Sequence, residues 1–240
     1  MAMVLALCVP SGAGREATAC VFAELPLETR HGFLLHALSY RQHEPATRAA
    51  ILLHDWAQVG SSCWGELPAE LCARGFDVLI PDLCGQGPSE MPGMLWLSRR
   101  DLAMLEWLDV TALLGWVGSS VDSIAVLCVG WAGWVAPQLV GEDWRVRHVV
   151  WICPQGEIEE GRRWDLPHRS SLELLLVSSE KEIESSALAG DLFSRLNPGV
   201  ELRLFSQSES GCSILSKTYF RTGLLDWLCA QPKFQSPGRQ

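Results

Sequence analysis

The chain has 240 residues, of which 48% are hydrophobic and 20% are charged, and its net charge is −9. This length and composition allow one α/β domain with a sizeable core, and they exclude bulk disorder. The acidic balance excludes a general binder of nucleic acid or of anionic membranes, because such binding needs clustered Lys and Arg.

Strand-like and helix-like segments alternate through the first half of the chain. The pattern predicts an antiparallel strand pair, then a buried strand, a helix, a second buried strand and a second helix, at residues 19–25, 32–40, 49–55, 62–75, 76–82 and 100–120. The continuous apolar runs of the two buried strands are typical of strands covered on both faces.

The second half continues the alternation of strands and helices. It predicts strands at residues 123–130, 146–154, 172–180 and 200–208, and helices at 131–141, 183–196 and 216–231. Such alternation implies right-handed crossovers and a mostly parallel sheet with helices on both faces. We therefore expect one α/β domain over residues 20–230, with a disordered tail at 231–240.

The nine cysteines bear on the compartment and on the N-terminal extension at residues 1–19. Their number is odd, no CxxC or Cys/His zinc spacing occurs, and several lie in apolar runs. We therefore expect buried, reduced thiols and a cytoplasmic or nuclear location. The extension leaves two alternatives open, a disordered segment or a signal peptide, because its apolar part is short and ATA before Cys20 resembles a cleavage site.

Polar and glycine-rich loops follow three successive buried strands of the predicted sheet. They read LLHDW at residues 52–56, PDLCGQGPSE at 81–90 and CVGWAG at 128–133. Chemistry in this class of fold collects at the carboxyl ends of the strands. We therefore expect these loops to build the functional site.

The order and spacing of these loops resemble an α/β-hydrolase. In that family one strand ends in His-Gly, the next leads into Asp-x-x-Gly-x-Gly-x-Ser, and the next ends in the Gly-x-Ser-x-Gly elbow that exposes the nucleophile. The first pattern is matched at His54, with Asp55 in place of glycine. The second is matched in full, at Asp82, Gly85, Gly87 and Ser89. The resemblance implies an α/β-hydrolase fold.

Longer stretches resemble the small, lidless α/β-hydrolases called abhydrolase-domain fourteen, A and B forms. Those proteins have an LLHG…W start, a DL-G-G-S-E loop and a TGLLDFL final helix, and this chain reads LLHDWAQVGSSCW, DLCGQGPSE and TGLLDWL. The segment at residues 155–171 is too short for a lid of several helices, so we expect little or no lid. One form of the subfamily associates with a transcription factor, which implies protein partners in the cytoplasm or nucleus.

The predicted elbow lacks a nucleophile. The family pattern is small-x-Ser-x-small-small, and in the best register Gly130 takes the serine position. A shift of two residues would place Ala132 there, which also has no nucleophilic atom. Cys128 comes two residues early, where strand alternation leaves its side chain in the packed sheet. We therefore predict that this turn supplies no covalent catalysis.

The acid and base positions of the family follow the last two predicted strands. Glu182 aligns with the acid, either as an orienting carboxylate or as an ordinary solvated side chain. Ser210 aligns with the histidine, and a hydroxyl is no general base near neutral pH. Of the six histidines, only His54 and His168 are placed to reach the cleft, and no histidine follows His168.

Two further departures from the family affect the predicted pocket. Trp131 and Trp134 flank the elbow, and either both pack in the core beneath the helix or Trp131 points into the cleft and blocks it. Asp55 lies in the loop that would stabilise a developing oxyanion, and a carboxylate there opposes that stabilisation.

The degenerate positions Gly130, Glu182 and Ser210 lead to a functional hypothesis. We expect a catalytically inactive α/β-hydrolase-fold protein, a pseudohydrolase that acts by binding a protein or a small hydrophobic ligand in the cleft. The alternative is an esterase or acyl hydrolase with rearranged catalytic residues, using Cys128 or His168. No nucleotide-binding motif of the GxGxxG or P-loop type occurs, so we expect no cofactor and no metal, and no nucleic-acid or membrane partner.

Overall fold

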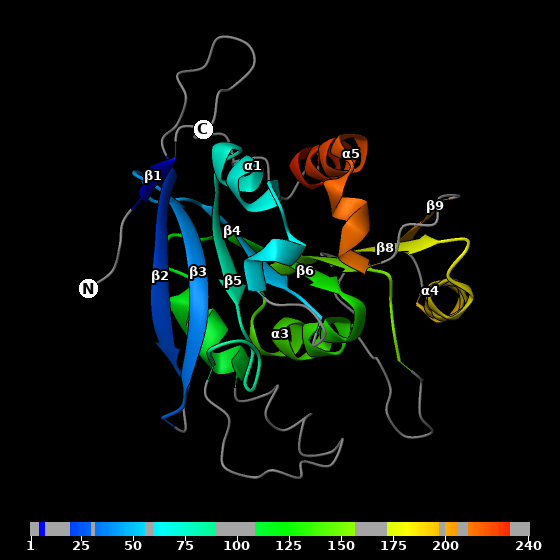
Figure 1. The fold of residues 1–240 in the computed structure, drawn as a ribbon, viewed down its shortest axis with the longest axis horizontal. Coiled ribbons are helices and arrows are strands. Elements are labelled where there is room, and N and C mark those ends of the chain that lie inside the picture. The colour runs from blue at the N-terminus through cyan, green and yellow to red at the C-terminus, as the bar shows by residue number, and fades with distance from the viewer. Residues whose placement is uncertain are drawn as a thin grey trace.

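The computed structural model describes most of the chain, namely residues 5–7, 20–29, 32–55, 60–89, 109–156, 172–196, 200–205 and 211–230. Within them, nine strands form one sheet in the order β1-β2-β3-β5-β4-β6-β7-β8-β9. Figure 1 shows α1 and α5 above the sheet and α3 below it, with α4 beside β8 and β9. The predicted fold class, a sheet with helices on both faces, is confirmed.

The strands at the β1 edge of the sheet are antiparallel. They are β1 (Leu5–Leu7), β2 (Cys20–Glu28) and β3 (Leu34–Gln42), and β3 also pairs antiparallel with β5. The predicted β2–β3 pair is closed by a hydrogen bond from the Thr29 N–H to the Phe33 carbonyl at 2.8 Å. Strand β1 lies in the N-terminal extension, where the sequence predicts no strand.

The remaining strands run parallel to one another. They are β4 (Arg48–Leu53), β5 (Phe76–Pro81), β6 (Ser123–Val129), β7 (Val146–Ile152), β8 (Glu173–Ser179) and β9 (Val200–Phe205). All five pairings between them, from β4–β5 to β8–β9, are parallel. Their carboxyl ends therefore meet at one edge, where the predicted loops lie.

The helical elements follow the predicted order but are shorter in two places. They are η1 (Gly60–Cys63), α1 (Leu67–Ala73), η2 (Gly130–Val135), α3 (Ala136–Glu142), α4 (Ile183–Arg195), η3 (Gly211–Ser216) and α5 (Thr218–Ala230), and residues 109–116 are also helical. The predicted helices at 62–75 and 131–141 each begin as a 3₁₀ turn, and a proline in the first turn, Pro68 or Pro137, then starts the α-helix. Proline favours that place because its missing N–H has no partner there.

Two hydrophobic cores lie on the two faces of the sheet. Successive side chains of β6 alternate between them, so that Cys128 packs with residues of α3 and α4, while Leu127 packs with residues of α1 and α5. Every residue of β6 is buried. This double burial explains why the inner strands are continuous apolar runs in the sequence.

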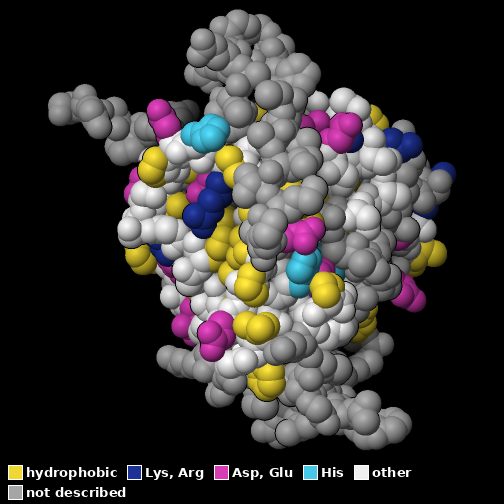
Figure 2. Space-filling view, turned by 60° about the vertical axis from the view of Figure 1, so that its left-hand side comes forward, with side chains coloured by type: hydrophobic (Ala, Val, Ile, Leu, Met, Phe, Trp, Pro, Cys, Tyr) yellow, Lys and Arg dark blue, Asp and Glu magenta, His cyan; other side chains and the backbone are white. Residues whose placement is uncertain are grey.

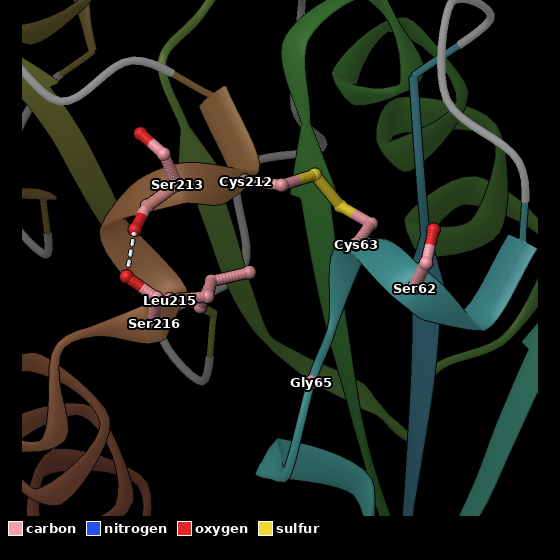
Figure 3. Close-up of a pocket in the computed structure, with 7 residues that line it drawn as sticks. All are labelled: Ser62, Cys63, Gly65, Cys212, Ser213, Leu215 and Ser216. Atoms are coloured by element: carbon pink, nitrogen blue, oxygen red, sulfur yellow. Dashed lines mark hydrogen bonds between the residues drawn. A yellow bond between two sulfur atoms is a disulfide. The ribbon is translucent and has the colours of Figure 1, made fainter.

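Two disulfides correct the prediction of reduced thiols. Cys20 of β2 is bonded to Cys72 of α1, and Cys63 of η1 is bonded to Cys212 of η3. Figure 3 shows the second bond joining the two 3₁₀ turns beside a cavity of about 460 Å³. The free cysteines of the described residues are Cys84, Cys128, Cys153 and Cys229. The bonded cysteines are 52 and 149 residues apart, so local sequence patterns cannot predict these pairs.

The surface agrees with the acidic composition. On the face shown in Figure 2, hydrophobic side chains gather near the middle, and the few basic side chains are separated from one another. The described part of this face thus carries no continuous basic patch. Among the helices that the structure describes, none is long and apolar enough to cross a membrane.

Candidate functional site

The turn after β6 has the geometry of an elbow. Val129 is extended, with φ −119° and ψ 137°, and Gly130 then adopts φ +58°, in the left-handed region that favours glycine. The indole N–H of Trp151 donates to the carbonyl oxygen of Gly130 at 2.7 Å. Gly133 lies in η2, and a Cβ there would lie 2.0 Å from Cε2 of Trp151. The 3₁₀ turn η2 therefore packs on β7 only because Gly133 has no side chain.

The space above Gly130 is filled by the side chain of Asp55. A Cβ built on Gly130 would lie 2.2 Å from Oδ2 and 2.7 Å from Cγ of Asp55. Real Cβ atoms do not approach a carboxylate so closely, so a side chain at this apex requires Asp55 to move. The two departures from the family pattern, Gly130 and Asp55, are therefore in direct contact.

A partly buried network of two imidazoles and a carboxylate holds the loop that carries Asp55. Nε2 of His54 lies 3.0 Å from Oδ1 of Asp82, and Nδ1 of His36 lies 3.0 Å from Oδ2 of the same carboxylate. Burial raises the pKa of a carboxyl group, but the hydrogen bonds with His54 and His36 offset it, so that the pKa of Asp82 lies below its ordinary value.

His54 is fully buried, and both of its ring nitrogens face oxygen acceptors. Nδ1 lies 3.0 Å from the backbone carbonyl of Asp55, which can only accept, so Nδ1 carries a proton that it donates. Nε2 lies against the carboxylate of Asp82, so both ring nitrogens are engaged by oxygens of the protein. His54 therefore holds the backbone of Asp55 in place and offers no nitrogen to a substrate, which excludes it as the base.

The Asp-x-x-Gly-x-Gly-x-Ser loop closes around the same carboxylate. The Ser89 hydroxyl donates to the backbone carbonyl of Asp82 at 2.5 Å and accepts from the backbone N–H of His36 at 2.9 Å. Gly87 has φ +48°, and a Cβ there would lie 2.8 Å from Oδ2 of Asp82. The motif that the sequence matches in full thus has a structural role.

Glu182 lies after β8, at the N-cap of α4, where the alignment to the family acid places it. Its side chain hydrogen-bonds to the thiol of Cys153, and its Oε2 atom is buried without a hydrogen-bond partner in the described part of the chain. Burial, with a smaller contribution from Glu182, raises the pKa of Cys153 to about 12. The reading of Glu182 as an ordinary solvated side chain is wrong, because one of its oxygens is shielded from solvent.

Cys128 has no access to the cleft. The side chain is fully buried in the core beneath β6, as strand alternation predicts. Burial raises the pKa of its thiol far above the ordinary range for cysteine. A thiolate nucleophile at this position is therefore excluded.

The two tryptophans of the elbow behave differently. Trp134 is 7% exposed, as predicted for the core, and its indole N–H donates to the Gln155 carbonyl at 2.8 Å. Trp131 is 38% exposed and lines a cavity of about 960 Å³, so the prediction that it packs in the core is wrong. Trp131 forms part of the cavity wall and leaves the cavity open, in contrast to the alternative in which it blocks the cleft.

Several predicted positions cannot be placed. Ser210 and His168 lie outside the described residues, as do the tail at 231–240 and most of segment 155–171. In the part of the chain that is described, no three His, Cys, Asp or Glu side chains are grouped in a way that could hold a metal ion.

Solved structures share this fold at low sequence identity. A structure described as a predicted CIB-like hydrolase from Thermoplasma acidophilum is 17% identical with a TM-score of 0.68, covering 87% of this chain and 98% of that one. The hydrolase GrgF from Penicillium is 13% identical with a TM-score of 0.66, covering 87% and 98%. The Pyrococcus furiosus esterase Pf2001 is 14% identical with a TM-score of 0.63, covering 87% and 92%.

A comparison with curated protein sequences gives no match. The family model described as the alpha/beta hydrolase family matches residues 50–234, which include most of β4, all of β5 to β9, the elbow and the Asp82 loop. This match covers more than half of the chain. The protein therefore belongs to the alpha/beta hydrolase family.

Proposed function

We propose that the protein is a non-catalytic member of its family, which acts by binding a protein or a small ligand at the cleft. The observation that carries this proposal is the contact between Asp55 and Gly130. A carboxylate stands where the side chain of a nucleophile would project, and the residue beneath it has no side chain.

The magnitude of the loss supports binding over turnover. Removal of the nucleophile or the base of a catalytic triad costs on the order of 10⁶ in turnover, and the remaining parts supply a residual acceleration of about 10³. Here the nucleophile position is Gly130 and the base position is Ser210. A carboxylate at the apex also opposes negative charge on a substrate oxygen, which weakens even the residual acceleration.

The finer placement in the abhydrolase-domain-fourteen subfamily belongs to the same proposal. Its support is the run of matched stretches, of which TGLLDWL lies in α5. The small size of the segment between β7 and β8 is consistent with a protein that has little or no lid. The resemblance supports a protein partner, but no described contact identifies one.

The alternative is an esterase or acyl hydrolase with rearranged residues. The described residues give its cysteine version no support, because Cys128 is fully buried. The likeness to solved esterases is below the identity at which activity can be transferred. The alternative therefore depends on His168, and ester turnover that depends on the cleft in the test below would support it.

We also infer an oxidising compartment, in place of the expected cytoplasm or nucleus. The support is the pair of disulfides, because such bonds persist in secretory and extracellular environments and are rare in the cytosol. The signal-peptide alternative for the N-terminal extension agrees with this inference.

A panel of fluorogenic short-chain esters tests the proposed function. The comparison uses the natural protein, a cleft variant, Glu182→Gln, and a matched control, Trp144→Leu, whose side chain is exposed and does not line the cavity. We expect the same background rate from all three. Turnover that Glu182→Gln lowers and Trp144→Leu leaves intact would show that the cleft is catalytic.

A further inference from the structure

The cavity beside the elbow is built from the ends of three neighbouring strands. Trp131 follows β6, Gln155 and Gly156 follow β7, and α4 follows β8 with its first three turns along the wall. The volume of about 960 Å³ lies in the range of roughly 300–1,000 Å³ that small-molecule sites occupy. The cavity therefore has room for a ligand and not only for a few water molecules.

The indole of Trp131 is held by its neighbours on one side. A Cβ on Gly156 would lie 2.9 Å from Cζ3 of Trp131 and 2.6 Å from Nε1 of Trp134, so the backbone of Gly156 packs against both rings. Trp134 fixes this segment through its hydrogen bond to Gln155. The remaining part of the Trp131 ring is a positioned, exposed aromatic surface.

Carboxylates outnumber cations along the wall opposite the indole. Among the described residues that line the cavity, Glu182, Glu184 and Asp191 are acidic and Lys181 is basic. The N-terminus of α4 and the ion pair of Asp191 with Arg195 at 2.9 Å reduce the negative field. The N-terminus of α4 acts on Glu182, its N-cap residue, and on Glu184 in the first turn, whereas Arg195 pairs with Asp191 and lies outside the lining.

One carboxylate oxygen in this wall lacks a hydrogen-bond donor among the described residues. Oε2 of Glu182 is buried and has no hydrogen-bond partner among the described residues. A buried carboxylate oxygen without a partner is destabilising, and such groups in native proteins are usually paired. A cation in the adjoining cavity would offset this cost through its charge.

We propose that this cavity binds a ligand with a protonated amine next to an apolar group. The amine contacts the face of Trp131, where a cation is attracted by the ring quadrupole, and donates to Glu182. The apolar group packs on Ile183, Ala187 and Leu188, which also line the cavity. This inference rests on the proposed binding function, because it concerns the same cleft. It is a claim about which ligands bind and not about turnover.

Titration calorimetry with three probes of matched shape tests the proposal. The probes are 2-phenylethylamine, 2-phenylethanol and phenylacetate, which are a cation, a neutral molecule and an anion at pH 7. We expect the amine to bind about fivefold more tightly than the alcohol, and phenylacetate to bind most weakly. Trp131→Leu and Glu182→Gln should each weaken the amine about fivefold, while Trp144→Leu should not change it.

Three outcomes would overturn the selectivity. They are equal or tighter binding of the alcohol or of phenylacetate, amine binding that Trp131→Leu leaves unchanged, and no saturable amine binding up to about 10 mM. Thermal unfolding of each variant confirms that it is folded, and Trp131→Leu is a mild change because the side chain is exposed. Ester turnover would contradict the proposed non-catalytic function. The relative affinities of the three probes would still test the ligand proposal independently.

Discussion

The carboxylate of Asp55 lies directly over the α-carbon of Gly130, in the space that any side chain at this apex would need. The loop after β4 thus supplies the group that occupies the space above the turn after β6. The contact joins two residues that are 75 positions apart in the sequence. A side chain at position 130 and a carboxylate at position 55 exclude each other.

A serine at the apex should therefore destabilise the protein. We expect Gly130→Ser to lower the free energy of unfolding by about 2–4 kcal/mol, from the overlap with Asp55 and from the positive φ. Adding Asp55→Gly should return at least about 1 kcal/mol, because the overlap is gone while the strain at φ +58° remains. Urea unfolding of the single and double variants measures both values.

A matched glycine separates the overlap from the strain. Gly65 has φ +52°, and a Cβ there meets nothing within 4 Å. Gly65→Ser should therefore lose only the strain contribution, about 1–2 kcal/mol. Equal losses for Gly130→Ser and Gly65→Ser, or a double variant no more stable than Gly130→Ser, would show that Asp55 does not occupy the apex.

The buried carboxylate of Asp82 should make stability depend on pH in the acid range. Its pKa is lower in the folded protein, so its contribution is fully present above the unfolded value of about 3.9. That contribution is lost as the pH falls through the folded pKa. Asp82→Asn should lower the free energy of unfolding by about 2–3 kcal/mol at pH 7, and the gap to the natural protein should narrow below about pH 4.

Asp77 provides a control of opposite sign. Burial raises the pKa of this carboxyl group, so its ionisation above the folded pKa works against folding. Asp77→Asn should therefore make the protein more stable relative to the natural chain as the pH rises from 4 to 7, in the same unfolding series. A gap for Asp82→Asn that stays constant with pH would contradict the role given to Asp82.

The free thiols should differ in reactivity because they differ in burial and pKa. Cys229 is partly exposed, whereas Cys84, Cys128 and Cys153 are buried. Burial and the neighbouring Asp109 raise the pKa of Cys84 to about 11, and burial raises the pKa of Cys128 still further. Among these four, iodoacetamide should label Cys229 first, as mass spectrometry of timed samples will show. Early, selective labelling of Cys128 would support the cysteine version of the alternative.

The disulfide between Cys63 and Cys212 joins the turn that follows the Asp55 loop to the turn that follows the base position. Peptide mapping without reduction should recover Cys63 linked to Cys212, and Cys20 linked to Cys72. Replacing Cys63 and Cys212 together by alanine should lower the free energy of unfolding by about 2–4 kcal/mol, since the closed loop is long. Four unlinked cysteines in protein from an oxidising compartment would contradict this pairing.

Sequence patterns predicted the sheet well because its inner strands are buried on both faces. Each of them is a continuous apolar run, and the loop motifs at Asp82 and Gly130 fixed which end carries the site. The extended outer pair was also predicted, since β2 and β3 flank a short turn. Strand β1 was missed because it is only three residues long, in a segment that also resembles a signal peptide.

Features that depend on contacts across the fold could not be predicted. The disulfide partners come together only through folding, and nothing in LLHDW shows that Asp55 would lie over Gly130. Trp131 and Trp134 look alike in a helical pattern, but the turn after the positive φ of Gly130 leaves the first in the cavity and places the second against Trp151. The shielded carboxylate of Glu182 likewise depends on Cys153, which follows a different strand.

Covalent labelling with a fluorophosphonate tests the absence of a nucleophile most directly. The probe reacts with an activated hydroxyl or thiol in a hydrolase cleft, and intact-mass spectrometry counts the adducts. The contact between Asp55 and Gly130 predicts an unchanged mass for the natural protein, as for an Asp55→Gly variant. A stoichiometric adduct mapped to a residue that lines the cleft, and lost on heat denaturation before labelling, would contradict the account.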